Sequence, residues 1–148
     1  MPSQALASAP GHRSGHVLAH STQTLIESLV DETETESRLL DELIAIMGRQ
    51  REAVQADDMQ AVDDSVFATH RVLATLAEAR RRHETLSRLL GNREDLALRS
   101  LNEALGARLT RELTAARTRR AAAAATLSSA VSANRRLLRA ALTHEPQP

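Results

Sequence analysis

The sequence predicts an all-α protein in which three long antiparallel helices form an elongated coiled-coil bundle, with a short extra helical segment. Apolar residues recur every three or four positions over most of the chain, which is the spacing of one helix face. Ala, Leu, Glu and Arg dominate the composition, whereas Gly and Pro are scarce and gather mainly near the two ends. Phe67 is the one aromatic residue, so the compact core that aromatic rings normally build is not expected.

Composition and charge exclude several classes of site. The chain has no Cys, which rules out disulfides and thiolate metal sites. Residues 1–91 carry 9 Arg against 14 Asp and Glu, a balance of −5, and residues 92–148 carry 10 Arg against 5 acids, a balance of +5. An acidic N-terminal part is therefore expected to face a basic C-terminal part. A nucleic-acid site is not expected, because the basic part has no aromatic residue on which bases could stack.

The chain divides into a central helical region and two polar ends. Residues 1–20 mix Pro, Gly, Ser and His without a helical period and predict a disordered tail. A helical domain is expected over 21–143 and a flexible end over 144–148. The first residues lack the hydrophobic core of a secretory signal, and no stretch approaches the roughly 18 apolar residues of a membrane span. A cytoplasmic protein without membrane insertion is the expectation.

The first long helix is predicted over 22–56. Thr24 and Glu27 have the spacing of a capping box, which would satisfy free amides at the helix start. The core-facing positions alternate steps of three and four, a heptad pattern that drives helices to pair side by side. These positions are Ile26, Leu29, Thr33, Glu36, Leu40, Leu43, Met47, Gln50 and Val54.

A tight reversal is predicted at 55–58, because Asp57 can cap a new helix and Gln60 completes the capping-box spacing. The second helix should then run over 58–90, followed by Gly91, a residue that suits a left-handed helix terminus. The residues expected on its apolar side are Val62, Val66, Thr69, Leu73, Leu76, His83, Leu86 and Leu90.

The remaining chain is predicted to form a short segment over 93–105 and a last long helix after Gly106. A single helix over 92–142 would be about 75 Å long, against roughly 50 Å for each of the first two, whereas a break at Gly106 gives three matched lengths. A continuous helix through Gly106 stays open, since one Gly costs only about 1 kcal/mol. The last helix keeps the three–four spacing at Leu109, Leu113, Ala116, Arg120, Ala123, Leu127, Ala130, Asn134, Leu137 and Ala141.

Catalytic and metal-binding patterns are missing, so neither an enzyme activity nor a cofactor is expected. Cys, Tyr, Lys and Gly-rich phosphate loops do not occur, and no pair of Glu-x-x-His motifs offers a metal site. His16 and His20 have a metal-clamping spacing but sit in a Gly- and Ser-rich context. His70 and His83 are mid-helix candidates for a phosphorelay histidine, yet the residues after His70 do not match the His-x-Leu-Lys-Gly of phosphotransfer domains. The run Arg80–Arg82 is interpreted as a solvated face.

The last helix carries more apolar surface near its end than one helix pair needs. Two interpretations stay open: these side chains complete the internal core, or the last turns offer an amphipathic helix to a groove of another protein. Burying four or five of them returns on the order of 6–12 kcal/mol before association costs remove several, so micromolar binding is reasonable. The stripe consists of Leu127, Val131, Leu137, Leu138 and Leu142.

Several short motifs follow one another along residues 22–142. They are Leu39-Leu40-Asp41-Glu42-Leu43, Gln50, Asp57-Asp58-Met59-Gln60-Ala61-Val62, Val72-Leu73 with Leu76, Leu89-Leu90-Gly91, and the Asn-x-x-Leu-Leu of Asn134-Arg135-Arg136-Leu137-Leu138. Together with the helix lengths and the reversal between the first two helices, this order resembles the FlgN-type export chaperones of the bacterial flagellum. One position departs from that family, since His70 stands where Lys is common.

The resemblance implies a non-enzymatic, cytoplasmic chaperone of flagellar type III secretion. Such proteins bind hook-associated (hook–filament junction) proteins as clients through a C-terminal amphipathic helix and present them to the export apparatus. Two alternatives remain: a structural or adaptor coiled coil of a secretion system that binds no client, and a helical phosphorelay module. The sequence leaves open the preferred client, the order of the last helix without a client, and the oligomeric state, including a homodimer. Carried onto this chain, the client-binding surface would be Leu127, Val131, Asn134, Leu137, Leu138, Ala141 and Leu142.

Overall fold

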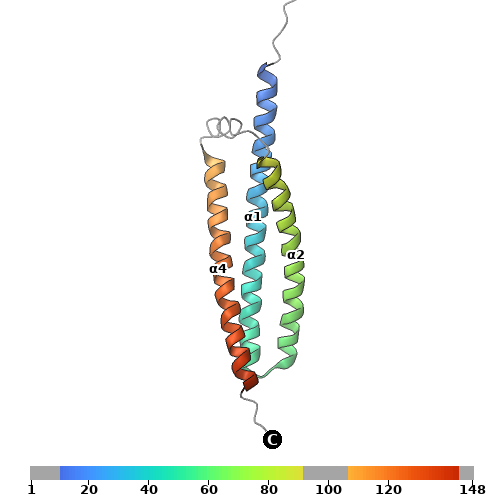
Figure 1. The fold of residues 1–148 in the computed structure, drawn as a ribbon, viewed down its shortest axis with the longest axis vertical. Helices are drawn as coiled ribbons and strands as arrows, with labels where there is room; N and C mark the ends of the chain where they lie inside the picture. Colours follow the sequence, from blue (N-terminus) through green and yellow to red (C-terminus); the bar gives the residue numbers. More distant parts are fainter. Residues whose placement is uncertain (1–10, 92–106, 144–148) are drawn as a thin grey trace, which may run out of the picture.

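The computed structural model describes residues 11–91 and 107–143, with side chains from Thr22 onward, and that part consists of three α-helices without a strand. The predicted all-α class is therefore confirmed. Figure 1 shows the three helices lying lengthwise beside one another, with the start of α1 projecting beyond the other two. The helices are α1, Gly11–Gln55; α2, Met59–Gly91; and α4, Arg108–Thr143.

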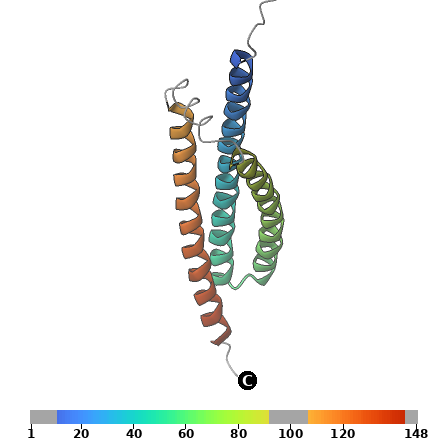
Figure 2. The same ribbon diagram turned by 45° about the horizontal axis from the view of Figure 1, so that its top comes forward.

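α1 is the central helix, with α2 on one side and α4 on the other (Figures 1 and 2). Hydrogen bonds between the side chains of α1 and α4 join residues 83–87 positions apart along their shared length, so these two helices run parallel. α2 runs the opposite way: Gln50 near the end of α1 bonds Ser65. Glu32, nearer the start of α1, bonds Arg82 instead. No Cα atom of α2 lies within 8 Å of one of α4, so each of these two helices packs on α1 rather than on the other.

The heptad seam predicted on α1 is confirmed. All its positions are buried except Val54, which is half-buried. Two polar members lie inside: Thr33 is fully buried, with its hydroxyl donating to Leu29 O over 2.7 Å, and Glu36 is 3% exposed. Ile46 is buried too, although the seam did not include it. A helix with a neighbour on each of two sides buries a wider stripe than one seam.

The seam predicted on α4 is confirmed over most of its length. Its buried members are Leu113, Ala116, Ala123 and Asn134, and Ala141 is the one exposed position. Side chains from all three helices meet in the larger of two core clusters, which we call the middle cluster. Its buried members are Leu40, Leu43, Ile46, Met47, Val72, Leu76 and Ala123.

On α2 the predicted apolar side is wrong at two positions. Val66 and Leu73 are exposed, while Ser65 and Val72 are buried in their place. The buried residues keep the strict three–four alternation that begins at Val62. At two steps of this alternation, the prediction chose the larger apolar neighbour of the residue that is buried. Helix geometry decides the face, because a shift of one position turns a side chain by about 100°.

The predicted reversal between α1 and α2 is confirmed, but Asp58 caps α2 rather than Asp57. Asp58 Oδ1 accepts the amide of Ala61 at 3.1 Å. Asp57 has a φ of 54°, and its amide donates to Val54 O at 3.2 Å. The amide of Asp58 donates to Ala53 O at 2.9 Å. These two bonds around a left-handed residue are the Schellman closure of a helix.

The two ends of the chain differ from expectation where they are described. Residues 11–20, predicted to belong to a disordered tail, instead form the first turns of α1. Extending an existing helix adds a hydrogen bond for each residue fixed, so even a Gly- and Ser-containing stretch can join it. Thr24 is therefore an interior residue and not the predicted N-cap. Residues 1–10 and the predicted flexible end at 144–148 lie outside the described residues.

The breaks after α2 and before α4 lie close to the predicted glycines. α2 ends at Gly91, but without the left-handed φ that the sequence suggested. Before α4, Ala107 has a φ of 60°, which a continuous helix through Gly106 cannot contain. The short segment predicted over 93–105 lies outside the described residues. None of the helices in the described part has the length and apolar character needed to cross a membrane.

Candidate functional site

The first part of the predicted client-binding surface belongs to the interior of the bundle. Leu127 and Val131 are half-buried and pack against the middle cluster. Asn134 is 3% exposed and is the last buried residue of α4. These three side chains are available to another protein only if the end of α4 moves away from α1.

The second part of the predicted surface lies on the last turns of α4, residues 135–143, which we call the α4 tip. Leu137 and Leu138 are half-buried. Ala141 and Leu142 are exposed, and Leu142 keeps 74% of its surface in solvent. The α4 tip thus presents one exposed leucine, Leu142, beside two that the rest of the described chain covers only in part.

Asn134 is tied to α1 by three hydrogen bonds. Its Nδ2 donates to Met47 O at 2.8 Å and to Gln50 Oε1 at 3.0 Å. Its Oδ1 accepts from Arg51 Nε at 3.3 Å. Both hydrogens of the amide group and its oxygen are thereby used, which is how a polar side chain remains in a core without penalty.

The same bonds reach α2 through Gln50. Gln50 Nε2 donates to Ser65 Oγ at 3.2 Å, and Ser65 Oγ donates to Val62 O at 2.6 Å. Asn134, Gln50 and Ser65, one from each helix, therefore form a continuous chain that we call the Asn134 network. Because each bond needs one particular alignment, the network fixes how far each helix is shifted along its neighbours.

Three arginines surround the leucines of the α4 tip. Arg135, Arg136 and Arg139 are exposed, and their guanidiniums form no hydrogen bond or ion pair with any described residue. The α4 tip is consequently an amphipathic, basic helix end.

A second polar layer crosses the bundle nearer its other end, formed by Glu36, His83 and Arg120. Arg120 Nη1 lies 3.4 Å from Glu36 Oε2 and 3.4 Å from His83 Nδ1. Glu36 Oε1 lies 3.3 Å from the same ring nitrogen. Outside the layer, Arg119 pairs with Glu34 at 3.0 Å on the surface. These contacts match the expectation that acidic residues early in the chain face arginines late in it.

The two neighbours of His83 Nδ1 favour opposite tautomers of the ring. The guanidinium of Arg120 can only donate and so needs Nδ1 to accept, whereas the carboxylate of Glu36 can only accept and so needs a hydrogen on Nδ1. Burial lowers the pKa of His83 below its usual 6.5, and the guanidiniums of Arg120 and Arg117 act in the same direction. The carboxylates of Glu36 and Glu32 oppose the change, but they do not outweigh it. His83 is thus neutral in the folded protein at pH 7.

The protein is expected to become less stable as the pH decreases, because of His83. Below pH 6.5 the unfolded chain takes up a proton on this histidine, while the folded chain resists it. The free energy of unfolding should therefore decrease as the pH is lowered from 6.5 to the pKa of His83 in the folded protein. Above pH 6.5 this histidine should cause no change in the free energy of unfolding. Urea unfolding at a series of pH values measures this slope. His83→Gln should flatten it, whereas His70→Gln, which changes an exposed histidine of the same helix, should leave it unchanged.

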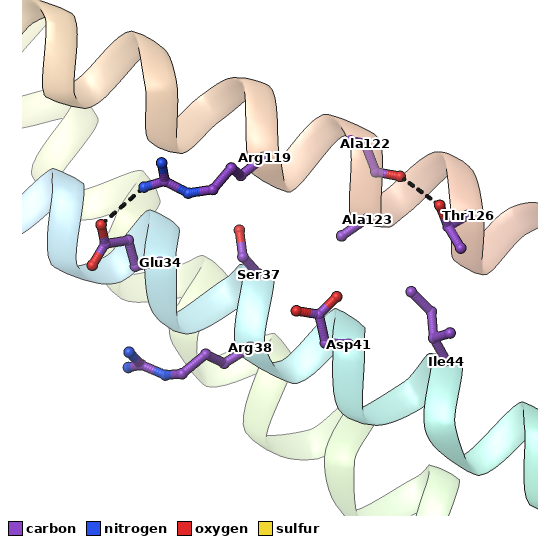
Figure 3. Close-up of a pocket in the computed structure, with 9 residues that line it drawn as sticks. All are labelled: Glu34, Ser37, Arg38, Asp41, Ile44, Arg119, Ala122, Ala123 and Thr126. Atoms are coloured by element: carbon purple, nitrogen blue, oxygen red, sulfur yellow. Dashed lines mark hydrogen bonds and ion pairs between the residues drawn. The ribbon is translucent and has the colours of Figure 1, made fainter.

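A shallow groove runs between α1 and α4 beside this layer, and Figure 3 shows side chains from both helices along it. The wall of the groove formed by α4 is low, because the residues there belong to the run Ala121–Ala125 and have small side chains. The ion pair between Arg119 and Glu34 crosses the groove near one end (Figure 3). Its shape suits a polypeptide segment better than an enclosed small molecule. The lining residues are Glu34, Ser37, Arg38, Asp41, Ile44, Arg119, Ala122, Ala123 and Thr126.

α2 carries an exposed apolar surface that sequence reasoning missed. Met59, Val66, Phe67 and Leu73 keep 63%, 41%, 70% and 44% of their surface exposed. We call these four residues the outer stripe. The signal was present as the heptad interval from Met59 through Val66 to Leu73, but two of these residues had been assigned to the core. Single exposed apolar residues are ordinary, whereas a row of them marks a contact surface.

The described residues contain no group of three or more His, Asp or Glu side chains placed to hold a metal ion. The side chains of His16 and His20 lie outside those that are described. The phosphorelay candidates differ in access: His70 is exposed, whereas His83 is held in the polar layer. Comparisons of the chain with protein-family models, with curated proteins and with solved structures found no match.

Proposed function

We propose that this chain is a non-enzymatic binding protein that captures another polypeptide through the α4 tip, as a cytoplasmic export chaperone of the FlgN type. The observation that carries the proposal is where burial stops on α4. Asn134 is the last buried residue, yet the helix continues to Thr143 with Leu137, Leu138 and Leu142 along it. A helix of apolar residues beyond the point where its own bundle covers it is suited to a partner's groove.

The size of this surface fits reversible binding. Covering the parts of Leu137, Leu138 and Leu142 that remain exposed would return about 3–6 kcal/mol, before the costs of association and ordering remove several. Micromolar binding needs a net of about 8 kcal/mol, so the leucines alone give a weak contact, which suits a client that must be released for export. The three unpaired arginines of the α4 tip add attraction for an acidic client helix.

The Asn134 network also supports the proposal, because it separates the part of α4 that is bound to α1 from the α4 tip. Upstream of Asn134 the helix is fastened to α1, so the α4 tip is displayed from a fixed support. The resemblance of the motifs to FlgN-type chaperones then suggests hook-associated proteins as the clients and the export apparatus as the place of delivery. A structural coiled coil that binds no client is the alternative, and it gives the leucines of the α4 tip no role.

Replacing Leu137, Leu138 and Leu142 together by Glu is expected to weaken capture of purified hook-associated proteins by about 100-fold or more, because truncating a few anchor side chains removes most of an interface's energy. Isothermal titration or pull-down measures the affinity. All three positions lie beyond the last buried residue, so helicity should be preserved, while the unfolding midpoint should fall slightly because Leu137 and Leu138 are half-buried.

Leu89→Glu is the matched control, since Leu89 is a leucine 49% exposed at the far end of α2. It should bind clients as the unchanged protein does. Undiminished capture by the triple variant would place the client surface elsewhere. A chain that never binds these clients, with or without the substitutions, would favour the structural alternative.

A further inference from the structure

The outer stripe of α2 lies outside the face that packs on α1. With 3.6 residues per turn, Met59, Val66 and Leu73 fall within about 40° of one another around the helix, and Phe67 lies about 100° from the middle of that row. The buried seam of α2 is centred roughly 95° from the row on the opposite side, so the row flanks the seam and Phe67 points away from it. Phe67, the one aromatic residue of the chain, is 70% exposed there.

The outer stripe is bordered by acidic residues at its start. Around the helix, Asp63 lies about 40° from both Met59 and Phe67, and its side chain forms no hydrogen bond or ion pair with any described residue. Asp64 follows it and accepts from Gln60 Nε2 at 3.0 Å. A partner for this surface is therefore an apolar helix face with basic residues beside it.

The α4 tip has that chemistry. Leu138 and Leu142 are one turn apart, and Arg135 and Arg139 form a parallel row next to them. Within one molecule α2 and α4 do not pack directly on each other, because α1 lies between them and their Cα atoms stay more than 8 Å apart. Yet the start of α2 and the end of α4 lie at the same end of the bundle (Figure 1).

We propose that a second copy of this chain covers the outer stripe: the α4 tip of each copy lies on the first half of α2 of the other, with leucines against Phe67 and its neighbours and arginines against Asp63 and Asp64. A two-fold axis near that end of the bundle makes both contacts at once, as an isologous dimer requires. The dimer does not depend on the proposed client binding. It does use the same leucines, so where both occur a client competes with the second copy.

Charge reversal on each surface tests the pairing. One variant carries Asp63→Arg and Asp64→Arg; the other carries Arg135→Glu and Arg139→Glu. Each variant alone places like charges at both contacts, so its dimer dissociation constant should rise by about tenfold or more. When the two variants are mixed, both contacts again join opposite charges. Sedimentation velocity over a concentration series should then recover a heterodimer close to the unchanged dimer.

The apolar half of the contact is tested separately. Phe67→Glu should weaken the dimer by about tenfold or more, because exposed aromatic side chains are frequent anchors of an interface. Leu89→Glu, outside the outer stripe, should leave the dissociation constant unchanged. Circular dichroism checks that every variant keeps its helicity, which is expected because all the altered side chains are exposed.

Three results would overturn the proposal. One is an unchanged chain that remains monomeric at every concentration. Another is a dimer that survives Phe67→Glu and both charge reversals, which would place the interface elsewhere. The third is a failure of the two reversed variants to pair when mixed although each has lost its own dimer. In that case, a different basic protein is the occupant of the outer stripe.

Discussion

Arg120→Met is expected to destabilise the bundle by about 3 kcal/mol, because it leaves the Glu36 carboxylate buried without a cation. The Glu36 side chain is 4% exposed, and Arg120, 26% exposed, is its charged partner at 3.4 Å. In the unchanged protein His83 is not a second cation at neutral pH, because burial lowers the pKa of its ring. Urea unfolding monitored by helicity gives the free energy directly, provided that the slope with urea is unchanged.

The neighbouring arginine offers a matched control. Arg119 pairs with Glu34 at 3.0 Å, but the two side chains are 58% and 42% exposed. Exposed ion pairs contribute little, so Arg119→Met should cost less than about 1 kcal/mol. If Arg120→Met proved equally mild, either water reaches Glu36 or His83 takes up a proton in place of the lost cation, and the same measurement on Arg120→Met with His83→Gln separates the two.

A third variant separates the cost of an unpaired charge from the worth of the layer itself. Replacing Glu36 and His83 by Leu together with Arg120→Met removes every charge of the layer. Buried ion pairs often contribute no more than well-packed apolar residues of similar volume, so this variant should recover to within about 1 kcal/mol of the unchanged protein or exceed it. The layer would then serve to align the helices rather than to strengthen them.

The parts of the fold that sequence predicts well are those governed by one repeating distance. On α1 and α4 the three–four alternation identified the buried face even where Thr33, Glu36 and Asn134 occupied it. On α2 the same rule gives Ser65 and Val72, and the error came from preferring the larger Val66 and Leu73. Periodicity outweighs side-chain size here, because the backbone fixes the direction of each residue before its chemistry matters.

The candidate site could be predicted only in part, because its key contacts join distant segments. The pattern marked Asn134 as a seam residue, but nothing local shows that it bonds Met47 and Gln50, 87 and 84 positions earlier. That pairing depends on how far α4 is shifted along α1. The heptad pattern does not determine this shift, because sliding one helix by whole heptads keeps the same face buried. The start of α1 at Gly11 was not predicted for a related reason. Residues with little helix propensity of their own become helical because they extend the stable helix that follows them.

Asn134→Ala is expected to cost about 2–3 kcal/mol, because it removes three hydrogen bonds and leaves Gln50 Oε1 buried without its donor. Ser132→Ala, an exposed change two residues earlier, should fall within about 0.5 kcal/mol of the unchanged protein. Hydrogen exchange should locate the loss: amides of residues 135–143 should exchange faster in Asn134→Ala, while those near Ala116 should not. Uniform acceleration along α4 would show that Asn134 supports the whole helix instead of fastening its end.

The same variant distinguishes two ways in which the proposed client could be held. If the client binds the α4 tip while it stays on α1, Asn134→Ala changes the affinity little, since the leucines beyond it are already accessible. If the client instead takes Leu127 and Val131 as well, the end of α4 must first leave α1, and the fraction of molecules in that state limits the apparent affinity. Lowering the cost of opening by about 2 kcal/mol should then tighten capture by up to roughly 30-fold, even though the protein itself has become less stable. Destabilisation accompanied by tighter binding is an outcome that only the second mode produces.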